Sequence, residues 1–323
     1  MPETRTAGRN LAMEAVRITE AAARAASLWM GRGDEESADQ AAVNAMDKAF
    51  KGLSIEGTIR IGESNANGIS KLIAGEKVGT GNGPAVDVAL MPVEGPTIVA
   101  KSEPNGLSVI AMAEGGQFLN FFELYMEKLA IGGGLPADLV DLDNEPADNL
   151  KALSQAKGVP VSDLVVCILD RPRHGEIIAK TREAGARIML IVDGDVSGVI
   201  ATAWPKSGID LYCGIGGAPQ GVLSAAALAC VGGQMQGRLV IRDNAERQKI
   251  ADAGIADPTQ KFSIADMASG NVTFAATGVT SGALLNGVTK VNNTAFTQSL
   301  VVRSQTGTLR YVEAYHQFGC ADG

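Results

Sequence analysis

The amino-acid sequence predicts an α/β fold, and two observations support this class. Between residues 164 and 233, apolar runs rich in β-branched side chains alternate with segments of helical period. Runs of this kind are typical of parallel strands that helices cover on both faces. The composition agrees, because 46% hydrophobic residues, 20% charged residues and 39 glycines describe a folded, turn-rich chain.

Two helices and several strands are expected in the first part of the chain. Residues 9–30 carry apolar side chains at helical spacing and end at Gly31. A second helix is expected over residues 37–50, with Ser37 as its N-cap. Each of the following apolar runs ends at a polar, glycine or proline turn, which predicts strands at residues 57–64, 85–91, 106–115 and 124–132.

A strand followed by a helix is the repeating unit of the later part. The predicted strands cover residues 164–170, 187–195 and 209–217, and the helices cover residues 174–185, 196–204 and 219–233. Such a series predicts a doubly wound sheet. A strand-rich tail from residue 271 is expected to close this second half. The pattern changes near residues 155–164, so we expect an N-terminal domain of residues 1–157 and a C-terminal domain of residues 158–323.

Charge and cysteine content exclude several classes of function. The net charge of -8 argues against a surface that neutralises the phosphates of nucleic acids or of anionic lipids, so neither partner is expected. The first residues lack the apolar core of a signal peptide, and no apolar stretch reaches about 18 residues, which predicts a cytoplasmic protein. Reduced, mostly buried thiols are expected, because no zinc or disulfide spacing links Cys167, Cys213, Cys230 and Cys320.

Carboxylates gather at the predicted ends of strands and helices. They are Asp34, Asp39, Glu63, Glu94, Asp193 and Asp195. Hard divalent cations prefer oxygen ligands, and a site completed by water and a substrate phosphate needs only a few of them from the protein. A magnesium-dependent phosphatase is therefore one interpretation. Taken singly, each carboxylate also fits a solvated cap or turn residue.

The segment "DRPRHG" at residues 170–175 lies between a predicted strand and a predicted helix. Arg171 and Arg173 would place two guanidinium groups at a helix start, which suits a phosphate monoester. The alternative is a pair of surface arginines that form ion pairs with Asp170 or Glu176.

Two other functions are disfavoured. The glycine-rich segment "GIGGAPQG" at residues 214–221 contains Pro219 and lacks an acidic residue about 20 positions further on, so it is a weak dinucleotide motif. His174 and His316 are the only histidines, and no serine or cysteine lies in a G-x-S-x-G context. A Ser-His-Asp hydrolase is not supported.

Several segments, spread in order from about residue 9 to residue 315, together resemble class II fructose-1,6-bisphosphatases. They are "GRGDEESADQAAVNAM", "AGEKVGTGNGPAVDVAL", "LYMEKLAIG", "DRPRHG", "DGDVSGVI", "GIGGAPQGVLSAA", "GGQMQGRL" and "FAATGVTSGALL". The resemblance implies the layered αβαβα sandwich of the sugar phosphatase and inositol phosphatase superfamily. It also implies Mg²⁺ or Mn²⁺ as cofactor, a homodimer or homotetramer, and a role in carbohydrate metabolism. The implied reaction is hydrolysis of the 1-phosphate of fructose-1,6-bisphosphate, and in some lineages of sedoheptulose-1,7-bisphosphate, by a metal-activated water.

The resemblance also implies roles for individual residues. The metal-site carboxylates are matched by Asp39 and Glu63, and the acid of the D-P-x-E-G-T turn by Glu94. A tyrosine that contacts substrate is matched by Tyr125. The residues that hold the distal phosphate and the sugar are matched by Arg171, Arg173, Asp193 and Asp195.

Five positions depart from the family pattern. Met91 and Asn67 stand where the family has aspartate, Gln220 where it has glutamate, Pro96 where it has threonine, and Glu35 where it has lysine. A methionine thioether is a soft, neutral donor that does not replace a carboxylate around Mg²⁺. Neutral amides also cannot accept a proton from an attacking water.

These departures leave two hypotheses. In the first, the chain is a sugar bisphosphatase that uses Asp39, Glu63 and Glu94 for the cation and Arg171 with Arg173 for the phosphate. In the second, it is a catalytically impaired or inactive paralogue, with or without a metal. Such a paralogue binds a sugar phosphate or assembles with a partner in a regulatory or scaffolding role.

Overall fold

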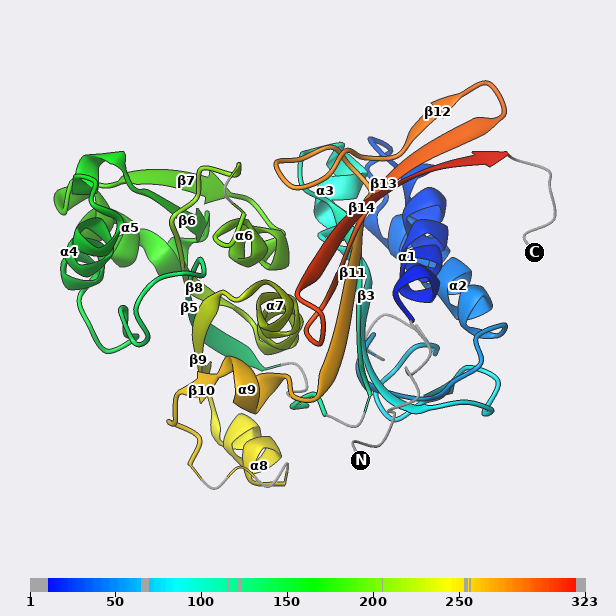
Figure 1. The fold of residues 1–323 in the computed structure, drawn as a ribbon, viewed down its shortest axis with the longest axis horizontal. Coiled ribbons are helices and arrows are strands. Elements are labelled where there is room, and N and C mark those ends of the chain that lie inside the picture. The colour runs from blue at the N-terminus through cyan, green and yellow to red at the C-terminus, as the bar shows by residue number, and fades with distance from the viewer. Residues whose placement is uncertain are drawn as a thin grey trace, which may run out of the picture.

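The computed structural model describes residues 11–64, 70–114, 117–120, 124–204, 206–252, 255 and 257–317, which form two mixed sheets with helices around them (Figure 1). The strand order of the first sheet is β12-β13-β11-β4-β3-β1-β2, and β14 pairs with β13. Its strands are β1 (Glu56–Ile61), β2 (Lys77–Val78), β3 (Ala85–Glu94), β4 (Leu107–Glu114), β11 (Asn271–Gly278), β12 (Thr289–Val291), β13 (Thr294–Arg303) and β14 (Thr308–Gln317).

The second sheet has the order β10-β9-β5-β8-β6-β7. Its strands are β5 (Tyr125–Ile131), β6 (Val165–Leu169), β7 (Arg187–Ile191), β8 (Leu211–Gly217), β9 (Gln234–Val240) and β10 (Phe262–Ser263). β6 pairs in parallel with β7 and with β8, as the repeated strand and helix units predict. β5 runs antiparallel to both β8 and β9, so the sheet as a whole is mixed.

Helices lie on both faces of each sheet. α1 (Ala12–Ser27) packs on one face of the first sheet, beside α2 (Glu35–Phe50). α6 (Asp195–Ala201) and α7 (Ala218–Val231) lie between the sheets, and α7 contacts strands of both. α4 (Pro146–Lys157) and α5 (Gly175–Glu183) cover the far face of the second sheet. The other α-helices in the described residues are α3 (Pro96–Lys101), α8 (Asn244–Asp252) and α9 (Ile264–Met267), and two 3-10 helices cover Val161–Asp163 and Pro172–His174.

The side chains of β5 explain how the second sheet is covered on both faces. Met126 and Ala130 belong to the core that also contains the buried residues of α6 and α7. Leu129 and Ile131 point the other way and join the core beneath α4. This alternation follows from the two-residue period of a strand. It separates the helix layer between the sheets from the outer helix layer.

The sheets do not divide at residues 157 and 158, where the sequence analysis places a domain boundary. β5 precedes that position but belongs to the second sheet, and β11 to β14 follow it but belong to the first sheet. The expectation that the tail closes the second half is therefore wrong. β11 pairs with β4 over its whole length, and this pairing joins segments that are far apart in the sequence. Local periodicity carries no information about such partners.

The predicted helix and strand positions are largely confirmed, with one correction at a cap. α2 begins at Glu35, and its N-cap is Asp34, whose side chain accepts a hydrogen bond from the Ser37 main-chain nitrogen at 2.9 Å. Ser37 is therefore a residue of the first turn. An aspartate at the N-cap accepts a hydrogen bond from a free N–H group three residues later as well as a serine would.

Cys167, Cys213 and Cys230 are buried free thiols, as expected, and Cys320 lies outside the described residues. Of the helices described, none combines the length and the hydropathy that crossing a bilayer requires.

Packing of α7 between the sheets generates a stability prediction. Leu223 is fully buried there, so Leu223→Ala leaves a cavity and should lower the free energy of unfolding by about 2–5 kcal/mol. The control Leu309→Ala removes a side chain that is 37% exposed and should cost about 0.5 kcal/mol or less. Urea unfolding measures both. Equal losses for the two variants would contradict the described packing of α7.

Candidate active site

A cleft of about 690 Å³ lies where the ends of several strands from both sheets meet. Most of the candidate residues from the sequence line it together: Asp39, Glu63, Met91, Pro96, Tyr125, Arg171, Arg173, Asp193, Asp195 and Gln220. These residues come from segments throughout the chain. The fold therefore brings the separately predicted residues into one place.

Two carboxylates from the first part of the chain share the cleft. Asp39 lies on α2, and Glu63 follows β1, where it forms an isolated bridge with Ile73. Burial raises the pKa of Asp39 to about 6. Burial, followed by the nearby charge of Asp39, raises the pKa of Glu63 to about 8. The two acids therefore repel each other, and a bound cation would relieve that repulsion.

Glu94 lies deeper, at the end of β3, and is 3% exposed. Its Oε1 accepts a hydrogen bond from the Val196 main-chain nitrogen at 2.6 Å, at the start of α6. Its Oε2 is buried and has no hydrogen-bond partner in the described part of the chain. Burial and the charges of Asp195 and Asp193 raise the pKa of Glu94 well above its ordinary value. A buried carboxylate oxygen without a donor is a candidate ligand for a cation.

A buried lysine that the sequence analysis does not single out pairs with one of these acids. Lys128 on β5 is fully buried, forms an ion pair with Asp195 and donates a hydrogen bond to the Gly217 carbonyl at 2.9 Å. The sequence signal was present, because a lysine in the apolar strand "LYMEKLAIG" must find a partner inside the protein.

The cationic side of the cleft consists of arginines that bind main-chain carbonyls. Arg173 donates from Nε and Nη2 to the Ile215 carbonyl, at 3.0 and 2.8 Å, and its guanidinium lies 5.3 Å from the centre of the Tyr125 ring. Arg171 donates to the Asp170 carbonyl at 3.1 Å. Within the described residues neither arginine forms an ion pair with Asp170 or Glu176, although the charge of Arg171 partly offsets the rise in the pKa of Asp193 that burial causes.

The positions that depart from the family pattern divide into three groups. Met91, Pro96 and Gln220 line the cleft itself. Glu35 accepts a hydrogen bond from the Thr97 hydroxyl at 2.9 Å, and Asn67 lies outside the described residues. Pro96 also has a structural role, because proline at the first position of α3 suits a helix start.

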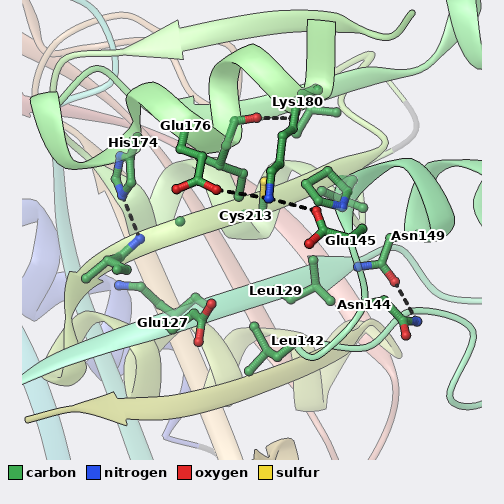
Figure 2. A pocket seen from close by; sticks show the side chains of 18 of the residues that line it. Glu127, Leu129, Leu142, Asn144, Glu145, Asn149, His174, Glu176, Lys180 and Cys213 are labelled. Atoms are coloured by element: carbon green, nitrogen blue, oxygen red, sulfur yellow. Dashed lines mark hydrogen bonds and ion pairs between the residues drawn. The ribbon is translucent and has the colours of Figure 1, made fainter. Parts of the chain in front are cut away.

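A second cavity, of about 360 Å³, lies on the other face of the second sheet, beneath α4 and α5. Figure 2 shows Lys180 between Glu145 and Glu176, with both carboxylates at 2.9 Å from its ammonium. Glu127 pairs with Arg238 at 2.8 Å. These charges neutralise one another. In the first cleft Asp195 is paired with Lys128, but among the described residues no ion pair is found for Asp39, Glu63 or Arg173. We therefore assign the candidate site to the first cleft.

His174 lines this second cavity, and both of its ring nitrogens form hydrogen bonds. Its Nδ1–H group donates to the Leu169 carbonyl at 2.7 Å, and its Nε2 accepts from the Ile215 main-chain nitrogen at 2.8 Å. Burial lowers the pKa of the ring, which favours the neutral form. His174 therefore anchors the 3-10 helix Pro172–His174, which also carries Arg173.

The oxygen donors of the cleft fit a hard divalent cation in kind. In the part of the chain that the structure describes, no group of three or more His, Cys, Asp or Glu side chains is arranged to hold a metal ion. The available carboxylates are the pair Asp39 and Glu63 and the unpartnered oxygen of Glu94. A cation on so few protein ligands would need water and substrate oxygens to complete its coordination.

A cleft that is lined by buried carboxylates and by arginines suits a phosphate ester together with a cation. The comparisons with known proteins agree. The family profile described as bacterial fructose-1,6-bisphosphatase, glpX-encoded, matches residues 9–316. The chain is 43% identical over 321 aligned residues to fructose-1,6-bisphosphatase 1 class 2 of Escherichia coli (strain K12), and 95% of each chain is covered. Fructose-1,6-bisphosphatases class 2 of Escherichia coli O6:H1 (strain CFT073) and Shigella flexneri show the same identity and coverage. The chain belongs to the class II fructose-1,6-bisphosphatase family.

The raised pKa of Glu63 generates a prediction for the metal-free protein. Between the ordinary value of 4.5 and the folded value of about 8, the folded state retains a proton that the unfolded state has lost. The free energy of unfolding should therefore fall as the pH rises through this window, and Glu63→Gln should flatten the fall. Urea unfolding with a chelator, at about pH 5 and about pH 8, measures it. The exposed control Glu56→Gln should retain the fall, and a slope unchanged by Glu63→Gln would contradict the described burial.

Proposed function

We propose that this protein binds a sugar bisphosphate in the cleft and hydrolyses one of its phosphate esters with the help of Mg²⁺ or Mn²⁺. The family supports the 1-phosphate of fructose-1,6-bisphosphate as the ester that is cleaved, with sedoheptulose-1,7-bisphosphate as a related substrate. The observation that carries the proposal is the convergence of acidic and basic candidate residues on one cleft. We further propose the αβαβα superfamily fold, a cytoplasmic location, and a homodimer or homotetramer.

The cation is proposed to bind the carboxylates that lack a counter-charge. Asp39 and Glu63 supply one pair of oxygens, and Glu94 supplies the oxygen that has no donor. A divalent cation held there would neutralise the developing charge on the phosphate and lower the pKa of a water molecule. The protein's own part is to keep these acids close together and partly shielded from water.

The phosphate that is not cleaved is proposed to bind Arg171 and Arg173. The Ile215 carbonyl holds the Arg173 guanidinium in place, and His174 in turn binds the Ile215 main-chain nitrogen. A guanidinium group that is already oriented loses little freedom when it binds a phosphate oxygen. The sugar hydroxyls are proposed to donate hydrogen bonds to Asp193 and Asp195. The Asp193 side chain is itself oriented by a hydrogen bond from the Gly194 main-chain nitrogen at 2.9 Å.

A second candidate function is a paralogue with impaired catalysis that still binds a sugar phosphate. The specific observation in its favour is that Met91 and Gln220 line the same cleft as Asp39 and Glu63. A thioether and an amide there supply no negative charge to a cation. Loss of one positioned acid or base typically costs about 10²–10⁴-fold in rate. This candidate predicts binding without appreciable turnover.

Restoring the family residues tests the two candidates. Release of phosphate from fructose-1,6-bisphosphate is measured with Mg²⁺ or Mn²⁺ for the unmodified chain and for a variant with Met91→Asp, Pro96→Thr, Asn67→Asp and Gln220→Glu. The unmodified protein should release phosphate, and the variant should be about 10²-fold faster or more, because three carboxylates return to the proposed cation site.

The outcomes separate the hypotheses. No phosphate release by the unmodified chain, together with binding that Arg173→Gln weakens, would contradict the enzyme and support the impaired paralogue. Turnover that the four substitutions leave unchanged would show that Met91 and Gln220 are not at the cation site. The matched control for a loss of positive charge is Arg310→Gln, which lies on β14, away from the cleft.

A further inference from the structure

Tyr125 is the centre of a cluster that neither the sequence analysis nor the family resemblance describes fully. It is the first residue of β5, and its main chain lies between Gly217 of β8 and Val240 of β9. α7, which follows β8 directly, and the loop that follows β9 therefore begin on either side of the Tyr125 main chain. Tyr125 itself lines the cleft, as Arg171 and Arg173 do.

Two guanidinium groups contact the Tyr125 ring. Arg173 lies 5.3 Å from the ring centre, and Arg242, which follows β9, lies 4.6 Å from it. A guanidinium over an aromatic face is favourable by itself. Tyr125 and Arg173 line the cleft, and Arg242, which is not itself a lining residue, extends the positive charge along the same ring.

Arg242 is held in one orientation by the start of α8. Its main-chain nitrogen and its Nε both donate to the Glu246 carboxylate, each at 2.7 Å, and Nη2 donates to it as well. Glu246 is 5% exposed, and its own main-chain nitrogen binds the Asp243 side chain at 2.8 Å. The acid is thus buried beneath the arginine, while the Arg242 side chain remains 54% exposed.

The remaining edge of Arg242 is available to a ligand. Glu246 engages Nε and Nη2, and no partner of Nη1 is found among the described residues. A phosphate monoester carries up to two negative charges and three acceptor oxygens, and a fixed guanidinium edge matches it well. Because Glu246 already orders the side chain, little conformational entropy is lost on binding.

We propose that Arg242 is a third guanidinium of the phosphate subsite around Tyr125 and that it binds the terminal phosphate monoester of a ligand in the cleft. This inference rests on the proposed function and extends its distal phosphate site from the loop after β6 to the loop after β9. Arg242 also determines specificity, because a ligand without the distal phosphate gains nothing from it. A purely structural role, as a support for the start of α8, would give no such discrimination.

Binding measurements test the proposal without turnover. Isothermal titration calorimetry in a chelator compares the unmodified chain, Arg242→Gln, Arg242→Lys and the control Arg310→Gln. The probes are fructose-1,6-bisphosphate, fructose 6-phosphate and fructose 1-phosphate. Arg242→Gln should weaken binding of the first two probes about 10-fold and leave fructose 1-phosphate unchanged. Arg242→Lys keeps the positive charge but loses the two-pronged geometry of the guanidinium, so its loss of affinity should be smaller than that of Arg242→Gln. The control Arg310→Gln should bind like the unmodified chain.

The ratio of fructose 6-phosphate to fructose 1-phosphate affinity in each protein is independent of the folded fraction, so a partly unfolded variant still gives an answer. An unchanged ratio in both Arg242 variants would overturn the proposal. Binding of inorganic phosphate distinguishes a failure of the proposal for Arg242 from a failure of the proposed function. If the unmodified chain binds no sugar phosphate but binds inorganic phosphate in a manner that Arg242→Gln weakens, the proposed function fails and the role of Arg242 stands. No binding of any phosphate by the unmodified chain would overturn both.

Discussion

The site depends on one buried polar connection between the two sheets, at the start of α6. Glu94, from the first sheet, accepts a hydrogen bond from the Val196 main chain, and Lys128, from the second sheet, pairs with Asp195. Both contacts end on adjacent residues of the same helix. Breaking one partner of a buried ion pair leaves an uncompensated charge inside the protein, which is strongly destabilising. This connection therefore keeps the acidic side of the cleft in a fixed relation to the strand ends of the second sheet.

The charge distribution of the cleft follows from that connection. Lys128 compensates Asp195, but Glu94 keeps an oxygen without a donor, and Asp39 faces Glu63. On the other side, Arg171 and Arg173 bind main-chain carbonyls instead of acids. Ion pairing inside the cleft is therefore partial, because Asp195 is compensated, whereas Arg173 forms no ion pair among the described residues. Such a cleft favours a ligand that carries a phosphate together with a cation. The neutral side chains of Met91 and Gln220 line the same cleft as the acids Asp39 and Glu63.

Much of the fold and of the site could be predicted from the sequence, because both depend on local patterns or on family motifs. The strand and helix units of the second sheet follow from apolar periodicity, and the motifs point to Asp39, Tyr125 and Arg173. The pairing of β11 with β4 could not be predicted, because it joins distant segments through a register that no local pattern encodes. Lys128 was visible as a charged residue in an apolar strand, yet its partner Asp195 is known only once the sheets are placed. Arg242 gave no signal, because its role depends on the pairing of β9 beside β5.

The central claim is that the unpartnered carboxylates of this cleft bind a divalent cation beside a phosphate held by arginines. Anomalous scattering from crystals grown with Mn²⁺ and fructose 6-phosphate tests it most directly. The account predicts a manganese peak in contact with carboxylate oxygens of Glu63 or Glu94, and the sugar phosphate against Arg171 and Arg173. A manganese ion bound only elsewhere, or a sugar phosphate in the cavity beneath α4 and α5 with none in the cleft, would contradict it.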